Sequence, residues 1–193
     1  DCRRFIETTL DVFGGIDILI NNAGITRDNI LLRMKEDEWE DIINTNLSSL
    51  YKMSKSVLRG MIKKRSGRII SITSVVGAMG NAGQSNYAAS KAGMINLTLT
   101  LALELAERDI RVNTVSPGPI ATEAFLEVLG IAADLDAIAS TIPLRRLGTP
   151  DDIGAAVLYL ASPASSWVTG QNILVAGGRT ERSYQYGGRE KKK

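Results

Sequence analysis

The 193-residue chain contains no histidine, only one cysteine, and a formal net charge of only +2. Without histidine, any proton transfer near neutral pH has to use another kind of side chain. The lone cysteine, Cys2, cannot form an internal disulfide, which fits a reducing compartment.

Long apolar runs and strong charge are also missing. No apolar run is long enough to span a membrane, and the charged start DCRRF is no signal peptide. The small basic excess lies largely in the terminal GGREKKK, so nothing indicates a nucleic-acid partner. We therefore expect a cytoplasmic protein that binds neither nucleic acid nor membrane.

Four short runs rich in isoleucine, valine and leucine alternate with helical patterns. The runs are expected to be buried strands, because none alternates cleanly between apolar and polar residues. They span 16–20, 67–73, 110–115 and 172–176. Helices are expected at 2–13, 37–63 and 85–108, and a last one begins TPDDIG at Thr149. This order predicts an α/β fold with an open parallel sheet and helices on both faces. Residues 1–178 form one unit, and 179–193 form a polar tail expected to be mobile.

The two longest expected helices differ in character. The first, 37–63, has an apolar stripe that includes Asn46, and a buried amide without a partner costs about 1–3 kcal/mol. Asn46 therefore either bonds a neighbouring carbonyl or takes part in function. The stripe consists of Trp39, Ile43, Leu47, Leu50, Met53 and Val57. The second, 85–108, has no charge between Lys91 and Glu104. A partner subunit is expected to cover the side that the sheet leaves free, giving at least a dimer.

Tyr87 and Lys91 are four residues apart near the start of a long expected helix. This spacing places both side chains on one face, about 5–6 Å apart at Cβ. A neighbouring ammonium favours the phenolate, so the pair could transfer a proton, or it could be a solvated polar edge. Tyr51 and Lys55 have the same spacing and are expected to be surface residues. Only the first pair is preceded by a strand that ends in Ser74, at the edge where open α/β sheets bind ligands.

The order and spacing of five motifs resemble the short-chain dehydrogenase/reductase family. They are NNAG (21–24), Asn46 in NTNLSS, Ser74 after its strand, YAASK with Tyr87 and Lys91, and SPGPIAT (116–122). The likeness extends to about Gly178 and implies a Rossmann-like fold and an NAD(P)(H)-dependent oxidoreductase. The NNAG and YAASK regions are most similar to reductases of 3-oxoacyl groups on acyl carrier protein, in fatty acid synthesis. From about residue 110 the chain is also similar to hydroxysteroid and small-alcohol dehydrogenases, which are the alternative.

The resemblance implies roles for four catalytic residues. Tyr87 would be the general acid, and Lys91 would lower the tyrosine pKa and bind the nicotinamide ribose. Ser74 would bond the substrate carbonyl oxygen. Asn46 would hold a water that relays protons to the lysine, which would give its amide a partner.

The resemblance also implies a cofactor, NADP(H) or alternatively NAD(H), and no metal. The residues that would line its path are Asn21, Ala23, Gly24, Tyr87, Lys91, Pro117, Gly118, Ile120 and Thr122. The family's glycine-rich phosphate turn does not occur in this sequence. We therefore expect these residues alone to bind NADP(H) weakly or not at all, and we expect an exposed apolar edge at the strand 16–20. A non-catalytic remnant that acts only by association is the alternative to an enzyme.

One macromolecular partner follows from the same likeness. In the reductases that the chain most resembles, an acidic carrier protein docks on basic residues near the mouth of the active site. Arg65 and Arg108 occupy the corresponding positions, and Lys63 and Lys64 add charge. Basic residues near helix C-termini also interact favourably with the helix dipole, which is a purely structural alternative.

Overall fold

The structure, a computed structural model, describes residues 2–129 and 134–179. Its centre is a four-stranded sheet in the order β1-β2-β3-β4, and every neighbouring pair is parallel. The strands are β1 (Ile18–Asn21), β2 (Gly67–Ile72), β3 (Ile110–Pro117) and β4 (Asn172–Val175). All four expected strands are present, so the predicted open parallel α/β sheet is confirmed.

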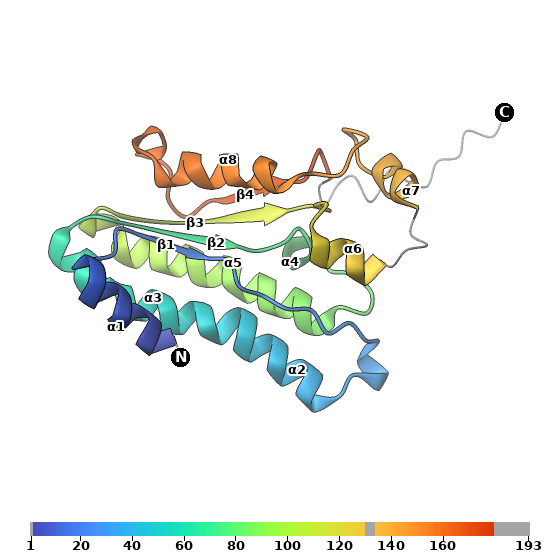
Figure 1. The fold of residues 1–193 in the computed structure, drawn as a ribbon, viewed down its shortest axis with the longest axis horizontal. Coiled ribbons are helices and arrows are strands. Elements are labelled where there is room, and N and C mark those ends of the chain that lie inside the picture. The colour runs from blue at the N-terminus through green and yellow to red at the C-terminus, as the bar shows by residue number, and fades with distance from the viewer. Residues whose placement is uncertain (1, 130–133, 180–193) are drawn as a thin grey trace.

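Eight α-helices surround this sheet in the described part of the chain. They are α1 (Cys2–Phe13), α2 (Glu36–Ile42), α3 (Ser49–Lys64), α4 (Val76–Met79), α5 (Ser85–Leu105), α6 (Glu123–Leu129), α7 (Leu135–Ser140) and α8 (Pro150–Ala161). Figure 1 shows α3 and α5 below the sheet and α8 above it. On the lower face α3 contacts β1 and β2, α5 contacts β3, and α1 packs on α3. On the upper face α8 contacts β2, β3 and β4, so both faces carry helices as expected.

Two apolar clusters fill the space between these layers. Successive residues of a strand point to opposite faces of a sheet, so neighbours in β2 enter different clusters. Ile69 packs with Val57 and Met61 of α3 in the larger cluster. Ile70 packs with Leu160 of α8 in the smaller one. Both clusters hold the strands in place so that their carboxyl ends form one edge.

Local signals fix the ends of two helices where the sequence predicts them. The α8 helix begins after Thr149, whose hydroxyl accepts a hydrogen bond from Asp152 N while the Asp152 carboxylate accepts one from Thr149 N. This capping box, with Pro150 at the first helical position, satisfies amides that a helix start leaves free. The α1 helix ends at Phe13, before Gly14 with φ of 73°.

The helix expected at 37–63 contains a turn that the sequence did not reveal. Between α2 and α3 the residues Ile43–Ser48 form a π-helical turn, so the helix continues with a locally wider winding. The stripe was partly wrong as a result: Trp39 is 40% exposed, and Ile43, Leu47 and Met53 are only half-buried. The residues that face the interior include Ile42, Asn46, Leu50, Val57 and Met61.

The α5 helix occupies the expected position and buries an unusually polar face. Its buried residues are Asn86, Ser90, Lys91, Met94, Thr98, Ala102 and Leu105. On its outer side Leu99 is 41% exposed and Leu103 is 83% exposed. In the part of the chain that the structure describes, no helix, α5 included, is long and apolar enough to cross a membrane. Coverage of this outer side by a partner subunit stays a prediction.

The β1 strand is an edge of the sheet, as the sequence predicts. Among the described residues it pairs only with β2. Leu19 is buried in the larger cluster, whereas Ile18 and Ile20 on the opposite face are 44% and 47% exposed. The tail expected to be mobile, apart from Arg179, lies outside the described residues.

Candidate active site

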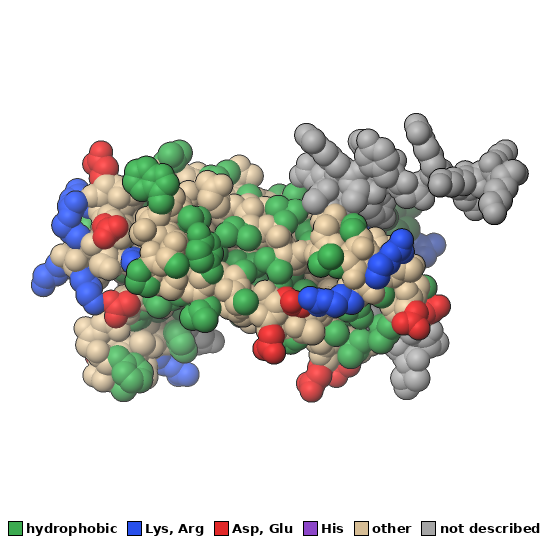
Figure 2. Space-filling view, turned by 90° about the horizontal axis from the view of Figure 1, so that it is seen from above, with side chains coloured by type: hydrophobic (Ala, Val, Ile, Leu, Met, Phe, Trp, Pro, Cys, Tyr) green, Lys and Arg blue, Asp and Glu red, His purple; other side chains and the backbone are tan. Residues whose placement is uncertain are grey.

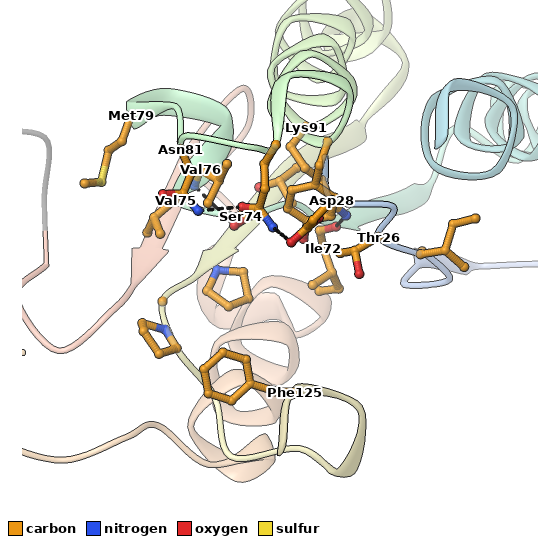
Figure 3. A pocket seen from close by; sticks show the side chains of 18 of the residues that line it. Thr26, Asp28, Ile72, Ser74, Val75, Val76, Met79, Asn81, Lys91 and Phe125 are labelled. Carbon is orange, nitrogen blue, oxygen red and sulfur yellow. Dashed lines mark hydrogen bonds between the residues drawn. The ribbon is translucent and has the colours of Figure 1, made fainter. Parts of the chain in front are cut away.

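The carboxyl ends of β2 and β3 open onto a cavity of about 800 Å³. Its walls come from the loop after β1, the turn after β2, the start of α5, and the loop after β3 that leads to α6 (Figure 3). The ends of neighbouring parallel strands are where α/β proteins bind ligands. Ser74, Tyr87 and Lys91 all line this cavity.

Ser74 is held in the turn between β2 and α4. Its Oγ accepts a hydrogen bond from Val76 N at 3.2 Å. The next residue, Val75, donates its backbone N–H to Pro117 O at 3.1 Å, which fastens the turn to the end of β3. The Ser74 hydroxyl is therefore fixed at the cavity wall.

The contact between α4 and α5 sets the distance from Ser74 to Tyr87 and Lys91. At Gly77 of α4, a Cβ atom would lie only 2.8 Å from the carbonyl carbon of Lys91. Glycine alone lets the two helices approach this closely. Gly77 therefore positions the serine turn against the helix that carries the other two side chains.

Lys91 is buried below the tyrosine ring, with 3% of its surface exposed. Its Nζ donates to the carbonyl of Ile72 at 2.9 Å and lies 5.4 Å from the centroid of the Tyr87 ring. Removal of the ammonium from water lowers the pKa of Lys91 from 10.5 to about 8. This lysine can therefore change its charge close to physiological pH.

The pKa of Tyr87 lies above its ordinary value. Burial raises this pKa, hydrogen bonding with Ser74 lowers it, and the charge of Asp28 raises it. Desolvation of the phenol is the largest of these effects, and a lowering of the pKa by Lys91 stays a prediction. Tyr87 therefore stays protonated at neutral pH, which is the state that a general acid requires.

Tyr51 and Lys55 form a matched pair outside the site. Lys55 Nζ is also 5.4 Å from the tyrosine ring centroid, but it donates directly to the Tyr51 hydroxyl at 3.0 Å. Tyr51 is 50% exposed, and the pair lies on the surface of α3 as expected. The same spacing therefore produces two environments, and burial beside Ser74 is what distinguishes Tyr87 and Lys91.

Asn46 lies in the π-helical turn and fastens the loop after β1. Its Oδ1 accepts from Ile25 N at 2.9 Å, and its Nδ2 donates to Ile25 O at 3.0 Å and to Ser90 Oγ at 3.4 Å. The amide thus finds partners in the protein, and the expected water relay stays a prediction. The first of the two alternatives for Asn46, a bond to backbone groups, describes its side chain.

Four of the expected cofactor residues join Tyr87 and Lys91 at the cavity, and three do not. Those that line it are Gly24, Pro117, Gly118 and Thr122. Asn21 donates to Ser71 Oγ at 3.3 Å, and Ala23 is not part of the cavity wall. Ile120 instead lines a separate cavity of about 90 Å³ near Gly148. The turn after Gly118 directs Ile120 away from the main site.

Sequence reasoning missed three polar residues near the site. Asn86 is fully buried and donates to Arg27 O and Glu38 O, both at 3.0 Å, while accepting from Tyr87 N. It therefore ties the start of α5 to the loop after β1 and to α2. Asp28 and Gln84 line the cavity. The available signal was that Asp28 follows NNAG and Gln84 precedes YAASK. No local sequence pattern shows, however, that these two side chains line a cavity.

Arg65 and Arg108 come together, but away from the cavity. Arg65 donates to the backbone of Glu107 at 2.6 Å, and both arginines are exposed. They immediately precede β2 and β3, whereas Ser74 and the cavity follow these strands, at a distance of roughly 20 Å along β2. Within one chain the two arginines therefore lie at the opposite end of the sheet from the cavity, and docking of a carrier protein on them stays a prediction. Figure 2 shows Lys and Arg side chains gathered at the left end, where the strands begin in Figure 1.

Comparison with known proteins identifies the family. Residues 1–180 match a family model described as Enoyl-(Acyl carrier protein) reductase. The chain belongs to the short-chain dehydrogenase/reductase family. It is therefore an oxidoreductase that works with a nicotinamide cofactor.

Three relatives show how specific this likeness is. The chain is 56% identical over 176 residues to the 3-oxoacyl-(acyl-carrier-protein) reductase of Vibrio harveyi, covering 90% of this chain and 70% of the relative. It is 53% identical over 167 residues to the Escherichia coli K12 reductase of the same name, covering 86% and 67%. It is 51% identical over 180 residues to that of Chlamydia pneumoniae, covering 93% and 71%.

Proposed function

We propose that this site reduces a 3-oxoacyl group, carried on acyl carrier protein, to a 3-hydroxyacyl group with hydride from NADPH. The observation that carries the proposal is the meeting of Ser74, Tyr87 and Lys91 at one cavity. Relatives that are more than half identical to this chain are reductases named for this reaction. Together these support a carbonyl reductase of fatty acid synthesis.

Ser74 and Tyr87 bind the substrate carbonyl oxygen through their hydroxyl groups in this proposal. Hydride addition to the carbonyl carbon forms a C–H bond and places negative charge on the oxygen. Tyr87 then transfers its phenol proton to that oxygen, which completes the alcohol and leaves a phenolate. Preorganised donors at the growing charge commonly contribute a few kcal/mol. Lys91, below the ring, stabilises the phenolate until a proton returns from solvent.

The residues present fit a nicotinamide group. A volume of about 800 Å³ falls in the range of cofactor and substrate sites. The Lys91 ammonium has three donors and uses one for Ile72 O, so two remain for ribose hydroxyls. The nicotinamide cofactor supplies the hydride. We assign Gly24, Pro117, Gly118 and Thr122 to its walls, and Asn21, Ala23 and Ile120 to the support of these loops.

The reduction itself can be measured with the purified chain. We expect it to oxidise NADPH in the presence of a 3-oxoacyl thioester, and more slowly NADH, at cofactor concentrations up to the millimolar range. The loss of reduced-cofactor absorbance reports the rate. The ketones that correspond to a hydroxysteroid and to a small alcohol are compared in the same assay. If either ketone were reduced faster than the 3-oxoacyl thioester, the substrate proposed here would be wrong. If neither NADPH nor NADH were oxidised with any carbonyl substrate, the proposed carbonyl reductase activity would be wrong.

The carrier protein is proposed to dock on the basic end of the molecule, formed by Lys63, Lys64, Arg65 and Arg108. Because this end lies away from the chain's own cavity, docking there has to serve a second copy. Antiparallel packing of two α5 helices about a two-fold axis would bring Arg108 of one copy beside the start of α5, with Tyr87, of the other. The exposed Leu99 and Leu103 provide the apolar surface for such packing.

Reversing both arginines tests this docking site. Arg65→Glu with Arg108→Glu should raise the KM for carrier-bound substrate, with a salt-dependent loss of affinity, because an acidic partner then meets negative charge. Turnover of a small free 3-oxo ester should change little. Steady-state kinetics of the variant and of the wild-type protein are measured with the carrier-bound substrate and with the free ester. An equal loss on both would mean that the arginines support the fold, and no loss on either would remove this docking site.

A further inference from the structure

The first turn of α5 begins without the usual side-chain cap. Its N-cap residue, Gln84, makes no capping hydrogen bond, and the turn has no acidic residue. A helix start leaves its first amides unpaired, and the amide of the third helical residue is one that a capping side chain commonly bonds. In α5 that amide belongs to Tyr87, and Asn86 Oδ1 accepts a hydrogen bond from it at 2.7 Å. Asn86 therefore replaces the missing cap from within the turn.

The same side chain anchors this turn to two other segments. Asn86 Nδ2 donates to Arg27 O and to Glu38 O, both at 3.0 Å, so both protons of its amide are used. Arg27 lies in the loop after β1 and lines the main cavity, and Glu38 lies in α2. Because Asn86 is 0% exposed, no solvent can take over these bonds when the side chain is removed.

Neighbouring backbone groups continue the contact between the loop and the helix. Asn29 N donates to Gly83 O at 2.8 Å, and Asn29 forms a parallel bridge with Gln84. We call residues 27–29 and 83–86 the loop–helix seam. Figure 1 shows the start of α5 near α2, where the chain that follows β1 passes both. Asn86 is the buried member of the seam.

The seam fixes the rotation of the turn that carries Tyr87. Successive residues of an α-helix point about 100° apart, so the direction of Asn86 sets the direction of Tyr87. The tyrosine hydroxyl lies at the end of a long side chain, and a small rotation of the turn therefore displaces it more than the backbone. A misplacement of about 1 Å at a reacting group can lower a rate by about 10²-fold.

We propose that Asn86 is a positioning residue that sets the direction of the Tyr87 hydroxyl for proton transfer. This inference rests on the proposed function, in which Tyr87 gives its proton to the substrate oxygen. The turn that carries Ser74 is fastened separately, to the end of β3 through Pro117 O. Loss of the Asn86 amide should therefore slow the proton transfer and leave substrate binding largely intact.

The substitution Asn86→Ala tests this inference by a comparison of kcat with KM. At one fixed NADPH concentration, the apparent kcat for a 3-oxo ester should fall by about 10- to 100-fold. The apparent KM for the ester should change by less than about threefold, because the Ser74 turn keeps its place. Steady-state kinetics of folded protein, checked by urea unfolding, measure both constants.

Asn113→Ala is the matched control, because Asn113 is an equally buried amide that fastens a different loop. It lies in β3, is 1% exposed and does not line the main cavity. Its Nδ2 donates to Val168 O and its Oδ1 accepts from Gln171 N, both at 2.9 Å. The control should lose a similar amount of stability and keep the wild-type kcat.

Three results overturn the inference and leave the proposed function intact. They are an unchanged kcat in Asn86→Ala, an equal fall of kcat in both variants, and a loss confined to KM. If Asn86→Ala does not fold, Asn86→Ser takes its place. A serine hydroxyl has one proton and can donate to at most one of the two carbonyls, so a smaller fall of kcat is expected. The same three results overturn the inference there.

If the wild-type protein reduces no carbonyl substrate, the proposed function fails on its own, and hydrogen exchange then decides about the seam. The amide of Asn29, which bonds Gly83 O, should exchange about tenfold faster in the Asn86 variant than in the wild-type protein. In Asn113→Ala it should exchange at the wild-type rate. An unchanged rate in the Asn86 variant, or the same increase in the control, overturns the inference.

Discussion

Tyr87→Phe should lower kcat/KM for carbonyl reduction by about 10²–10⁴-fold, the usual contribution of a general acid. The substitution removes the phenol proton that the alcohol needs and retains the ring that packs above Lys91. Because the pKa of Tyr87 lies above its ordinary value, the wild-type phenol is protonated throughout the neutral range. The rate should therefore fall at every pH near neutrality, and steady-state assays from acid to mildly alkaline pH measure the effect.

Tyr51→Phe is the control for this experiment, because it removes the same atom from a pair of the same spacing. Tyr51 is half exposed and its hydroxyl bonds only Lys55 among the described residues. Its loss should leave turnover close to the wild-type value. If the two variants kept the same activity, the assignment of Tyr87 as the acid would be wrong.

Lys91→Met should remove a large pH-dependent term from the free energy of unfolding. The pKa of Lys91 is about 8 in the folded chain, below its ordinary value of 10.5, because the ammonium is desolvated. Between these two values the unfolded chain binds more protons than the folded one, so wild-type stability rises with pH there. The cost of burying the charge is about 3 kcal/mol below pH 8 and disappears towards pH 10.5.

Urea unfolding of both proteins at several pH values between 7 and 10.5 measures this difference. The Lys91→Met variant should be the more stable protein near neutral pH, and the advantage should shrink as the pH rises. Lys55→Met is the control, since the pKa of Lys55 is raised by its bond to Tyr51 and that lysine keeps its proton over most of this range. A constant difference between wild type and Lys91→Met would show that the ammonium is not desolvated as described.

The sequence predicted the strands, the C-terminal end of α1 and the N-terminal start of α8, because the signals for these features are local. A capping residue, a proline or a glycine acts on the few residues beside it, as Thr149 and Gly14 show. The exposure of Trp39 was not predictable in this way. It depends on the π-helical turn that follows, and a π-helical turn has no composition of its own.

The site was predictable to the extent that its residues point in fixed directions from regular elements. Tyr87 and Lys91 share a helix face, and the end of β2 places Ser74 near them. The partners of Asn46 were not predictable, since Ile25 lies 21 residues away in the sequence and in a loop. The place of Ile120 at the smaller cavity was not predictable for the same reason, because a loop does not fix the direction of its side chains.

The π-helical turn at Ile43–Ser48 holds one residue more than an ordinary α-helical turn. Deletion of one residue there would convert the turn to ordinary α-helix and leave α2 and α3 close to their present relative rotation. Val57 and Met61 would then stay in the core, and the displaced side chains would be those of the turn itself, Asn46 included. A one-residue deletion in the regular part of α3 would instead rotate the residues beyond it by about 100°, so the turn is the point where this helix best tolerates a change of length.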